Sequence, residues 1–202
     1  MRAARSVCWI DGGSGAEIVH QLKYGGWHAL AEPMATRMAR MTWPDDVMRE
    51  RTALVPVPLA STRQRERGFN QSERLAEALA SAWAIPVWND VLVRARCTST
   101  QTRLTPDERR RNVSGAFRAV SAARARLRGA HLMLVDDVVT TGATLVECAS
   151  ALIDGGARIT SFVTFGRAPA AGDRVDGGNR VVTTESKSKQ RSKVSIRNSE
   201  LR

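Results

Sequence analysis

Short apolar runs alternate with amphipathic stretches along most of the chain. The runs have the length and apolar content of β-strands, and they cover residues 53–58, 91–95, 132–135 and 158–165. The run LMLV at 132–135 is apolar at every position, as expected for a parallel strand that is buried on both faces. Strands that alternate with helices along a chain predict an α/β fold, with a mainly parallel sheet flanked by helices.

The stretches between these runs carry apolar residues at helical spacing. The first covers residues 14–41 and is predicted to break at the sequence YGG. A second begins at Asn70, where NQSE has the form of a capping box. A short helix is predicted from Thr105, because TPDE places a proline and a glutamate in its first turn. The last helix is predicted from Thr144 to the glycine pair at 155–156.

Composition divides the chain into three parts. Residues 1–50 are predicted to be a helical lead-in, residues 51–169 the α/β core, and residues 170–202 a disordered basic tail. The whole chain has 31 lysines and arginines against 20 acidic residues, which gives a formal net charge of +11. This balance favours anionic partners, although a solvated basic surface explains it equally well.

Cysteine and histidine usage predicts neither a disulfide framework nor a structural metal site. Cys8, Cys97 and Cys148 are far apart, and the three histidines have no metal-ligand spacing. We therefore expect a reducing compartment, most simply the cytoplasm. No apolar run approaches the roughly 18 residues of a membrane span. The N-terminal stretch is not a convincing signal peptide.

The residues with the clearest chemistry follow the apolar run at 132–135. Asp136 and Asp137 end the predicted strand, and the small residues TTGAT and a helix come next. Ligands of parallel α/β sheets bind beyond the carboxyl ends of strands. Both carboxylates can face one ligand only if the chain already turns there, because neighbouring side chains of a strand point to opposite faces. Backbone N–H groups of the loop, together with the helix N-terminus, would form a cradle for an anion.

Carboxylates for hydroxyl groups beside a cradle for a phosphate suit a ribose 5-phosphate. A Walker B strand also ends in acidic residues, but the chain has no GxxxxGK[ST] loop, and GGSGAE at 12–17 lacks the lysine. A carboxylate pair that binds Mg²⁺ directly is a second alternative. A strand–loop–helix unit with acidic caps is the purely structural alternative, and it does not account for TTGAT.

The stretch LMLVDDVVTTGAT resembles, over its whole length, the phosphoribosyl-pyrophosphate (PRPP) motif of type I phosphoribosyltransferases. Residues 55–80 and 105–117 resemble more narrowly the ComF family, whose members are linked to DNA uptake in competent bacteria. The likeness covers residues 15–168. It implies a type I phosphoribosyltransferase-like fold and PRPP, or a related ribose phosphate, as ligand. It also implies Mg²⁺ as a cofactor that is held through the ligand and not directly by the protein.

Roles for single residues follow from the resemblance by position. Asp136 and Asp137 would bind the ribose hydroxyls and act in catalysis. The residues that would wrap the 5-phosphate are Val139, Thr140, Thr141, Gly142, Ala143 and Thr144. The loop after residues 55–58 corresponds to the pyrophosphate loop, and the basic segment 94–113 to a flexible hood that closes over PRPP. In these two segments, the candidates to reach the pyrophosphate are Arg63, Arg65, Arg67, Gly68, Gln101, Arg103, Arg109, Arg110 and Arg111.

Other readings of the basic residues stay open. A basic surface that contacts RNA or DNA is the alternative for the arginines, although the aromatic residues form no RNP-like stacking motif. Lys23 is typical of the family, but its helix is more simply explained by packing than by catalysis. Many ComF relatives begin with a four-cysteine zinc-binding segment. Only Cys8 precedes the first predicted helix here, so that segment is expected to be absent, or lost by truncation or a different start.

The resemblance thus predicts a phosphoribosyltransferase that transfers the phosphoribosyl group of PRPP to an acceptor which the sequence does not specify. The alternative is a non-catalytic accessory or regulatory protein of the DNA-uptake machinery that binds PRPP, a nucleotide or DNA. Competence proteins would be partners in either case. The oligomeric state is left open.

Overall fold

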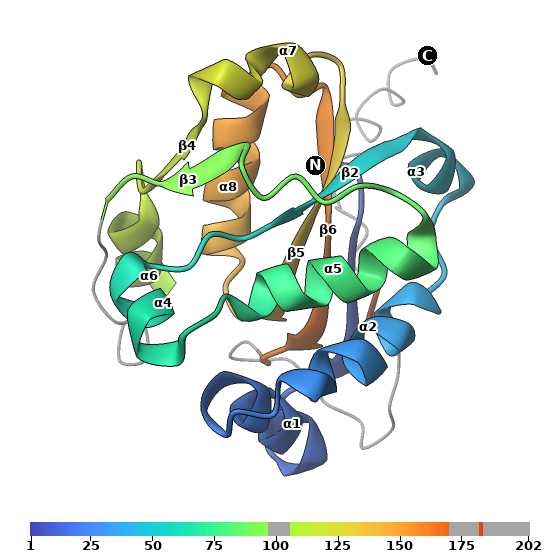
Figure 1. Cartoon of the computed structure of the whole chain (residues 1–202), viewed down its shortest axis with the longest axis vertical. Coiled ribbons are helices and arrows are strands. Elements are labelled where there is room, and N and C mark those ends of the chain that lie inside the picture. The colour runs from blue at the N-terminus through green and yellow to red at the C-terminus, as the bar shows by residue number, and fades with distance from the viewer. Residues whose placement is uncertain (97–105, 170–181, 184–202) are drawn as a thin grey trace, which may run out of the picture.

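One mainly parallel sheet organises the part of the chain that the computed structural model describes, which is residues 1–96, 106–169 and 182–183 (Figure 1). The strand order is β2-β5-β6-β1-β7. The strands are β1 (Ala4–Trp9), β2 (Arg51–Pro56), β5 (His131–Val139), β6 (Ile159–Arg167) and β7 (Val182–Thr183). Within this sheet β2, β5, β6 and β1 run parallel to one another, and the short β7 pairs antiparallel with β1.

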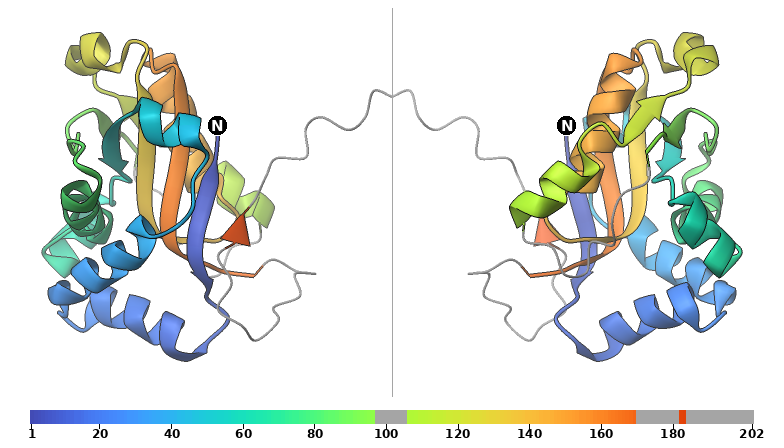
Figure 2. Two further views of the ribbon diagram at one scale, coloured as in Figure 1. Left: turned by 90° about the vertical axis from the view of Figure 1, so that its right-hand side faces the viewer. Right: turned by 90° about the vertical axis from the view of Figure 1, so that its left-hand side faces the viewer.

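Helices cover both faces of the sheet (Figure 2). The elements that share a core with one face are α1 (Gly13–Tyr24), η1 (His28–Leu30), α2 (Ala31–Ala39), α3 (Asp45–Glu50) and α5 (Gln71–Trp83). The elements on the other face are β3 (Leu92–Arg94), α6 (Pro106–Val113), β4 (Phe117–Ala119), η3 (Ser121–Ala123), α7 (Arg124–Leu127) and α8 (Ala143–Asp154). Between β2 and α5 lies α4 (Ser61–Arg67), and β3 pairs with β4 in a separate antiparallel sheet.

The pleat of the strands divides the core between these two layers. On β5, Met133 and Val135 pack with the residues of α2 and α5, whereas Leu132 and Leu134 pack with those of α8. All four side chains are fully or almost fully buried. Because successive side chains of a strand alternate between faces, a strand with helices on both sides is apolar at every position. The predicted fold class, an α/β fold with a mainly parallel sheet flanked by helices, is confirmed.

Most of the predicted elements are present. The helical stretch at 14–41 is divided at the YGG sequence into α1 and the pair η1–α2. Helix α5 begins after Asn70, whose side-chain oxygen accepts a hydrogen bond from the Ser72 backbone N–H at 3.1 Å. The carboxylate of Glu73 accepts a hydrogen bond from the Asn89 side chain at 2.8 Å, so it makes a tertiary contact in place of the predicted capping-box bond.

Strand β1 corrects the prediction that residues 1–50 are helical. It pairs with β6 although two of its buried residues are polar. The Arg5 guanidinium donates a hydrogen bond to the Thr42 carbonyl oxygen at 3.0 Å, and the hydroxyls of Ser6 and Thr164 lie 2.7 Å apart. Polar groups can be buried in a sheet when each has such a partner. Residues 1–50 therefore supply one strand of the main sheet in addition to helices.

Part of the predicted hood and most of the predicted tail lie outside the described residues. These parts are residues 97–105, which include the predicted N-cap Thr105, and residues 170–181 and 184–202. Within the described part of the chain, no helix has both the length and the apolar character that crossing a membrane requires.

Candidate functional site

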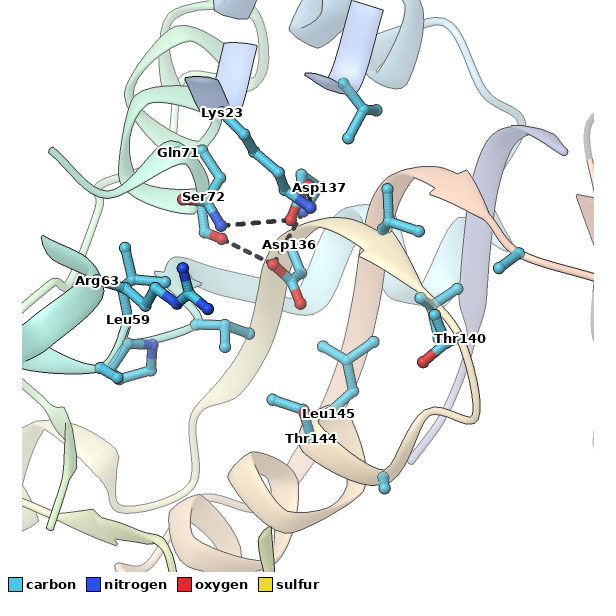
Figure 3. Close-up of a pocket in the computed structure, with 18 of the residues that line it drawn as sticks. Lys23, Leu59, Arg63, Gln71, Ser72, Asp136, Asp137, Thr140, Thr144 and Leu145 are labelled. Carbon is cyan, nitrogen blue, oxygen red and sulfur yellow. Dashed lines mark hydrogen bonds and ion pairs between the residues drawn. The ribbon is translucent and has the colours of Figure 1, made fainter. Parts of the chain in front are cut away.

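A cavity of about 560 Å³ opens beyond the carboxyl ends of β2 and β5 (Figure 3). Its walls come from α1, the loop after β2, α4, the start of α5, the end of β3, the end of β5 and the loop before α8. This is the edge of a parallel sheet at which ligands bind. Elements that are far apart in the sequence therefore meet at one place.

Asp136 and Asp137 both line the cavity, but β5 continues through them as far as Val139. The turn that was predicted at the carboxylate pair therefore comes later, and the two side chains point in different directions. In Figure 3 the Asp137 carboxylate points toward Lys23 of α1, whereas the Asp136 carboxylate points toward Ser72 and the open cavity. The two carboxylates are thus adjacent in sequence but not equivalent in position.

Hydrogen bonds fix both carboxylates. Oδ1 of Asp136 accepts one bond from the Ser72 hydroxyl at 2.8 Å and one from the backbone N–H of Asp137 at 2.9 Å. Oδ1 of Asp137 lies 3.4 Å from the Gln71 side-chain nitrogen, which donates to it. Oδ2 of Asp137 forms an ion pair with the Lys23 ammonium group. The first turn of α5 and the last turn of α1 therefore hold the pair from two sides.

These surroundings give the two carboxyl groups opposite pKa shifts. Burial raises the pKa of Asp136 to about 7, and the negative charge of Asp137 adds to the effect. Burial also acts against the ionised form of Asp137, but the neighbouring Lys23 ammonium outweighs it and holds the pKa of Asp137 below its ordinary value. Near neutral pH, Asp137 is therefore ionised and Asp136 is close to the midpoint of its titration.

The loop between β5 and α8 has the form of an anion cradle. Gly142, the N-cap of α8, has a φ of 76°, a left-handed conformation that favours glycine. The Thr141 hydroxyl oxygen accepts a weak hydrogen bond from the Ala143 N–H at 3.4 Å. All six residues predicted to wrap the 5-phosphate, from Val139 to Thr144, line the cavity. Backbone N–H groups at the start of a helix attract an anion there.

The segment after β2 is helical where a loop was predicted, and this corrects the expected arrangement of its arginines. Arg63 and Arg67 are one helical turn apart on α4 and both line the cavity. Arg65 is exposed and is not among the lining residues, because it lies off that face of the helix. Gly68 does not line the cavity either; it ends α4 with a φ of 78°. A glycine in this left-handed conformation commonly ends a helix, and close approach of a ligand to its backbone stays a prediction.

The predicted hood contributes one cation that was not among the candidates. Arg94, at the end of β3, lines the cavity, and its guanidinium lies 5.3 Å from the centre of the Phe117 ring. Arg111 is exposed on α6 and is not among the lining residues. The remaining hood candidates lie outside the described residues, either completely or by their side chains: Gln101, Arg103, Arg109 and Arg110.

Sequence reasoning also missed the residues that support the carboxylates and Arg67. The Arg67 guanidinium donates to the side-chain oxygens of Gln71 and Tyr24, each at 2.9 Å, and lies 4.7 Å from the centre of the Tyr24 ring. The capping signal NQSE could have placed Gln71 and Ser72 near the site, because it marks a helix that begins close to a strand end. No comparable signal points to Tyr24, and only the resemblance to the ComF family singles out Lys23; both residues reach the cavity from α1.

Comparison of the sequence with known proteins gives a result that agrees with the geometry of the cavity. The family model of the phosphoribosyl transferase domain matches residues 67–195. The chain is 37% identical over 148 residues to the DNA utilization protein YhgH of Salmonella typhi, which covers 69% of this chain and 61% of that protein. It is 38% identical over 100 residues to competence protein F of Haemophilus influenzae, covering 50% of this chain and 43% of that protein. The chain thus spans less than two thirds of the length of these curated relatives.

Solved structures resemble the chain more remotely. Glutamine PRPP amidotransferase from B. subtilis, complexed with ADP and GMP, matches with a TM-score of 0.45 and 20% identity over 68% of this chain and 26% of that one. A hypoxanthine phosphoribosyltransferase from Staphylococcus aureus matches with a TM-score of 0.38 and 11% identity. The match covers 74% of this chain and 69% of that one. Both TM-scores are below 0.5, so the assignment rests on the sequence matches. These show that the chain belongs to the phosphoribosyl transferase domain family, as a relative of the ComF-type competence proteins.

Proposed function

We propose that the chain binds PRPP together with Mg²⁺ and transfers its phosphoribosyl group to an acceptor. The observation that carries the proposal is that the carboxylate pair and the loop before α8 line one cavity. A ribose that carries a 5-phosphate has hydroxyls that suit the carboxylates and a phosphate that suits the loop. Membership of the phosphoribosyl transferase domain family supports the same ligand.

The cavity offers a separate region for each part of PRPP. The loop from Val139 to Thr144 would hold the 5-phosphate, and Asp136, whose carboxylate points toward the open cavity, would accept hydrogen bonds from the ribose hydroxyls. Arg63, Arg67 and Arg94 also line the cavity and would neutralise the pyrophosphate. The anionic ends of the ligand would thus meet the N-terminus of α8 and guanidinium groups, while the ribose hydroxyls would meet a carboxylate.

The residues present fit Mg²⁺ that is held through the ligand. Among the described residues no group of three or more His, Cys, Asp or Glu side chains could hold a metal ion. Mg²⁺ prefers oxygen ligands, keeps several of its waters and binds readily to substrate phosphates, so the oxygens of PRPP would supply its sites. When bound, the ion would offset charge that develops on the pyrophosphate as it leaves.

The chain's own residues would act mainly by positioning and charge. Phosphoribosyl transfer through an oxocarbenium-like state needs no covalent nucleophile, so the work lies in orienting the ribose and stabilising the leaving group. Gln71 and Ser72 hold the carboxylates, and Tyr24 holds Arg67. Loss of one such charged contact to a developing charge costs ~3 kcal/mol, about a hundredfold in rate.

Calorimetric titration of the full chain with PRPP, with and without Mg²⁺, tests the proposal. We expect binding that requires Mg²⁺ and that the double variant Asp136→Asn/Asp137→Asn loses. Asp45→Asn/Asp46→Asn is the matched control, because it also neutralises two adjacent aspartates but lies on α3, away from the cavity. Unchanged affinity in the first variant, with both variants folded by circular dichroism, would contradict the site assignment.

A second candidate function is a non-catalytic accessory role in DNA uptake. The names of the relatives, DNA utilization protein and competence protein, and the formal net charge of +11 favour it. In that case the cavity would bind PRPP or a nucleotide as an effector without turnover. An assay for pyrophosphate release distinguishes the two functions. The chain is incubated with PRPP and candidate acceptors, beginning with nucleobases and ammonia. Release is expected from a transferase and not from a protein that binds PRPP as an effector.

A further inference from the structure

Lys23 forms a largely enclosed ion pair at the cavity. Its ammonium group contacts Oδ2 of Asp137, and the side chains of the two residues are 21% and 4% exposed. The pKa of Lys23 is raised in spite of its burial, because of the charge of Asp137. Breaking a buried pair by removing one partner leaves an uncompensated charge, which is strongly unfavourable. Lys23 is therefore tied to one particular carboxylate of the pair.

The four carboxylate oxygens differ in what they contact. Asp137 has Lys23 on Oδ2 and Gln71 on Oδ1, so both of its oxygens are engaged by the protein. Asp136 receives the hydrogen bonds from Ser72 and from the backbone on a single oxygen, Oδ1. Figure 3 shows the other oxygen of Asp136 pointing into the cavity. Asp136 is therefore the carboxylate that is presented to a ligand.

We propose that Lys23 is a positioning residue for PRPP binding: it binds and neutralises Asp137, so that Asp136 alone meets the ribose hydroxyls. The inference rests on the proposed function and specifies how the same site is arranged. PRPP is a polyanion, and a second uncompensated carboxylate beside it would repel it. The neutralised Asp137 instead serves as an anchor for the end of α1.

The same end of α1 also positions an arginine that lines the cavity. Tyr24, the next residue, accepts a hydrogen bond from Arg67 and stacks against its guanidinium. Lys23 and Tyr24 therefore connect α1 to the carboxylates and to an arginine that faces the pyrophosphate region. A change at Lys23 acts on the ligand through Asp137, and it leaves the phosphate loop before α8 untouched.

Several charged or titratable groups surround the pair and contribute to its pH response. Lys23 comes from α1, Arg67 from α4, and the Cys148 thiol of α8 lies near Asp136. Helix α5 adds the uncharged Gln71 and Ser72. Removing the Lys23 charge would raise the pKa of both carboxyl groups. The pH at which PRPP affinity is half-maximal would then move upward, an effect that loss of packing alone does not produce.

The test is a double-mutant cycle on PRPP affinity, measured by calorimetry with Mg²⁺ at several pH values. We expect Lys23→Met to weaken binding by about tenfold or more, because Asp137 is left buried and unpaired. Lys23→Met/Asp137→Asn has no unpaired charge and is expected to bind within about threefold of the wild type. Arg40→Met, which removes one exposed positive charge at the end of α2, is the control and should bind like the wild type.

The outcomes separate this inference from the proposed function. If the wild type binds no PRPP, both are overturned. If the wild type binds and Lys23→Met binds equally well with an unshifted pH profile, the inference alone is wrong. If Lys23→Met melts below the assay temperature, the double variant decides: binding within about threefold of the wild type supports the inference, and a loss of more than about tenfold overturns it.

Discussion

At the scale of single residues, the two aspartates show how one strand can present carboxylates with different properties. Lys23 stabilises Asp137 as an anion. Burial and the neighbouring negative charge of Asp137 disfavour the ionised form of Asp136. The folded chain thus keeps a carboxylate at the cavity in a place that disfavours its charge. Sites that bind ligands commonly contain such locally unfavourable groups.

This arrangement predicts that Asp136→Asn stabilises the protein while it weakens ligand binding. The pKa of Asp136 is about 7 in the folded chain against 3.8 for an unperturbed aspartate, so the folded state binds more protons between these values. Raising the pH through that window therefore lowers the free energy of unfolding of the wild type. The amide retains an oxygen for the bonds from Ser72 and the backbone, and it carries no charge.

Thermal melts of the two proteins between pH 4 and pH 8 provide the measurement. We expect the melting temperature of Asp136→Asn to exceed that of the wild type most at pH 8, and the difference to shrink as the pH falls from 7 to 4. Asp45→Asn on α3 serves as the control for a simple change in net charge. A variant that is less stable than the wild type at pH 8 would contradict the pKa shift of Asp136.

The sequence could predict the site residues that lie next to one another along the chain. It could not predict the residues that tertiary packing places at the cavity from distant elements. Asp136 and the loop up to Thr144 form one uninterrupted motif, so their shared cavity follows from a single strand–loop–helix unit. Lys23 and Arg94 reach the same cavity from other elements. Arg94 has no local pattern that separates it from the other basic residues of the chain, and only the family resemblance singles out Lys23.

At the scale of elements, the start of α8 combines a tight turn with the proposed phosphate site. Gly142 and Gly129 have nearly the same positive φ, 76° and 75°. A Cβ atom has room at both: the nearest atom is 3.9 Å away at Gly142, and none lies within 4 Å at Gly129. The two positions therefore differ mainly in location, since Gly142 lines the cavity and Gly129 does not.

Alanine at either glycine is expected to cost about 1–2 kcal/mol of stability, because a side chain disfavours the left-handed conformation. Only Gly142→Ala is expected to weaken PRPP binding as well, since relief of the strain would shift the N–H groups around the 5-phosphate. Urea unfolding and calorimetry of both variants measure the two effects. Equal affinity in the two variants would argue against this loop as the phosphate site.

Two elements were predicted wrongly for identifiable reasons. Strand β1 contains Arg5 and Ser6, whose polar groups obscure a buried strand until their partners are known. Helix α4 consists of polar residues without an apolar face, so no hydrophobic periodicity marks it. Its helical form nevertheless decides which of its arginines line the cavity, because it turns Arg63 and Arg67 toward the cavity and Arg65 away.

At the scale of the whole molecule, the excess of positive charge suits both proposed kinds of anionic ligand, PRPP and DNA. The two are expected to respond differently to cations. Nonspecific DNA binding releases counterions and falls steeply with salt, and Mg²⁺ competes with it. PRPP binding in the cavity is expected to need Mg²⁺. The ion would therefore raise the affinity for PRPP and lower the affinity for DNA.

We therefore expect the affinity for mixed-sequence duplex DNA to fall about a hundredfold or more between 50 and 200 mM salt, and to decrease further with Mg²⁺. Asp136→Asn/Asp137→Asn is expected to leave DNA binding unchanged or slightly stronger. Fluorescence anisotropy of a labelled duplex provides the measurement. DNA binding that requires Mg²⁺ and is lost in this variant would instead place DNA in the cavity.

The pairing of β1 with β6 also bears on how the protein is made. Ala4 lies opposite Phe162 in the sheet, so β1 leaves the ribosome long before its partner β6 has been synthesised. Contacts between such distant residues form slowly, because a long loop has to close first. Helix α1, which carries Lys23, directly follows β1 along the chain. The nascent chain would therefore complete the rest of the sheet first, and the binding cavity would be finished only in the final step of folding.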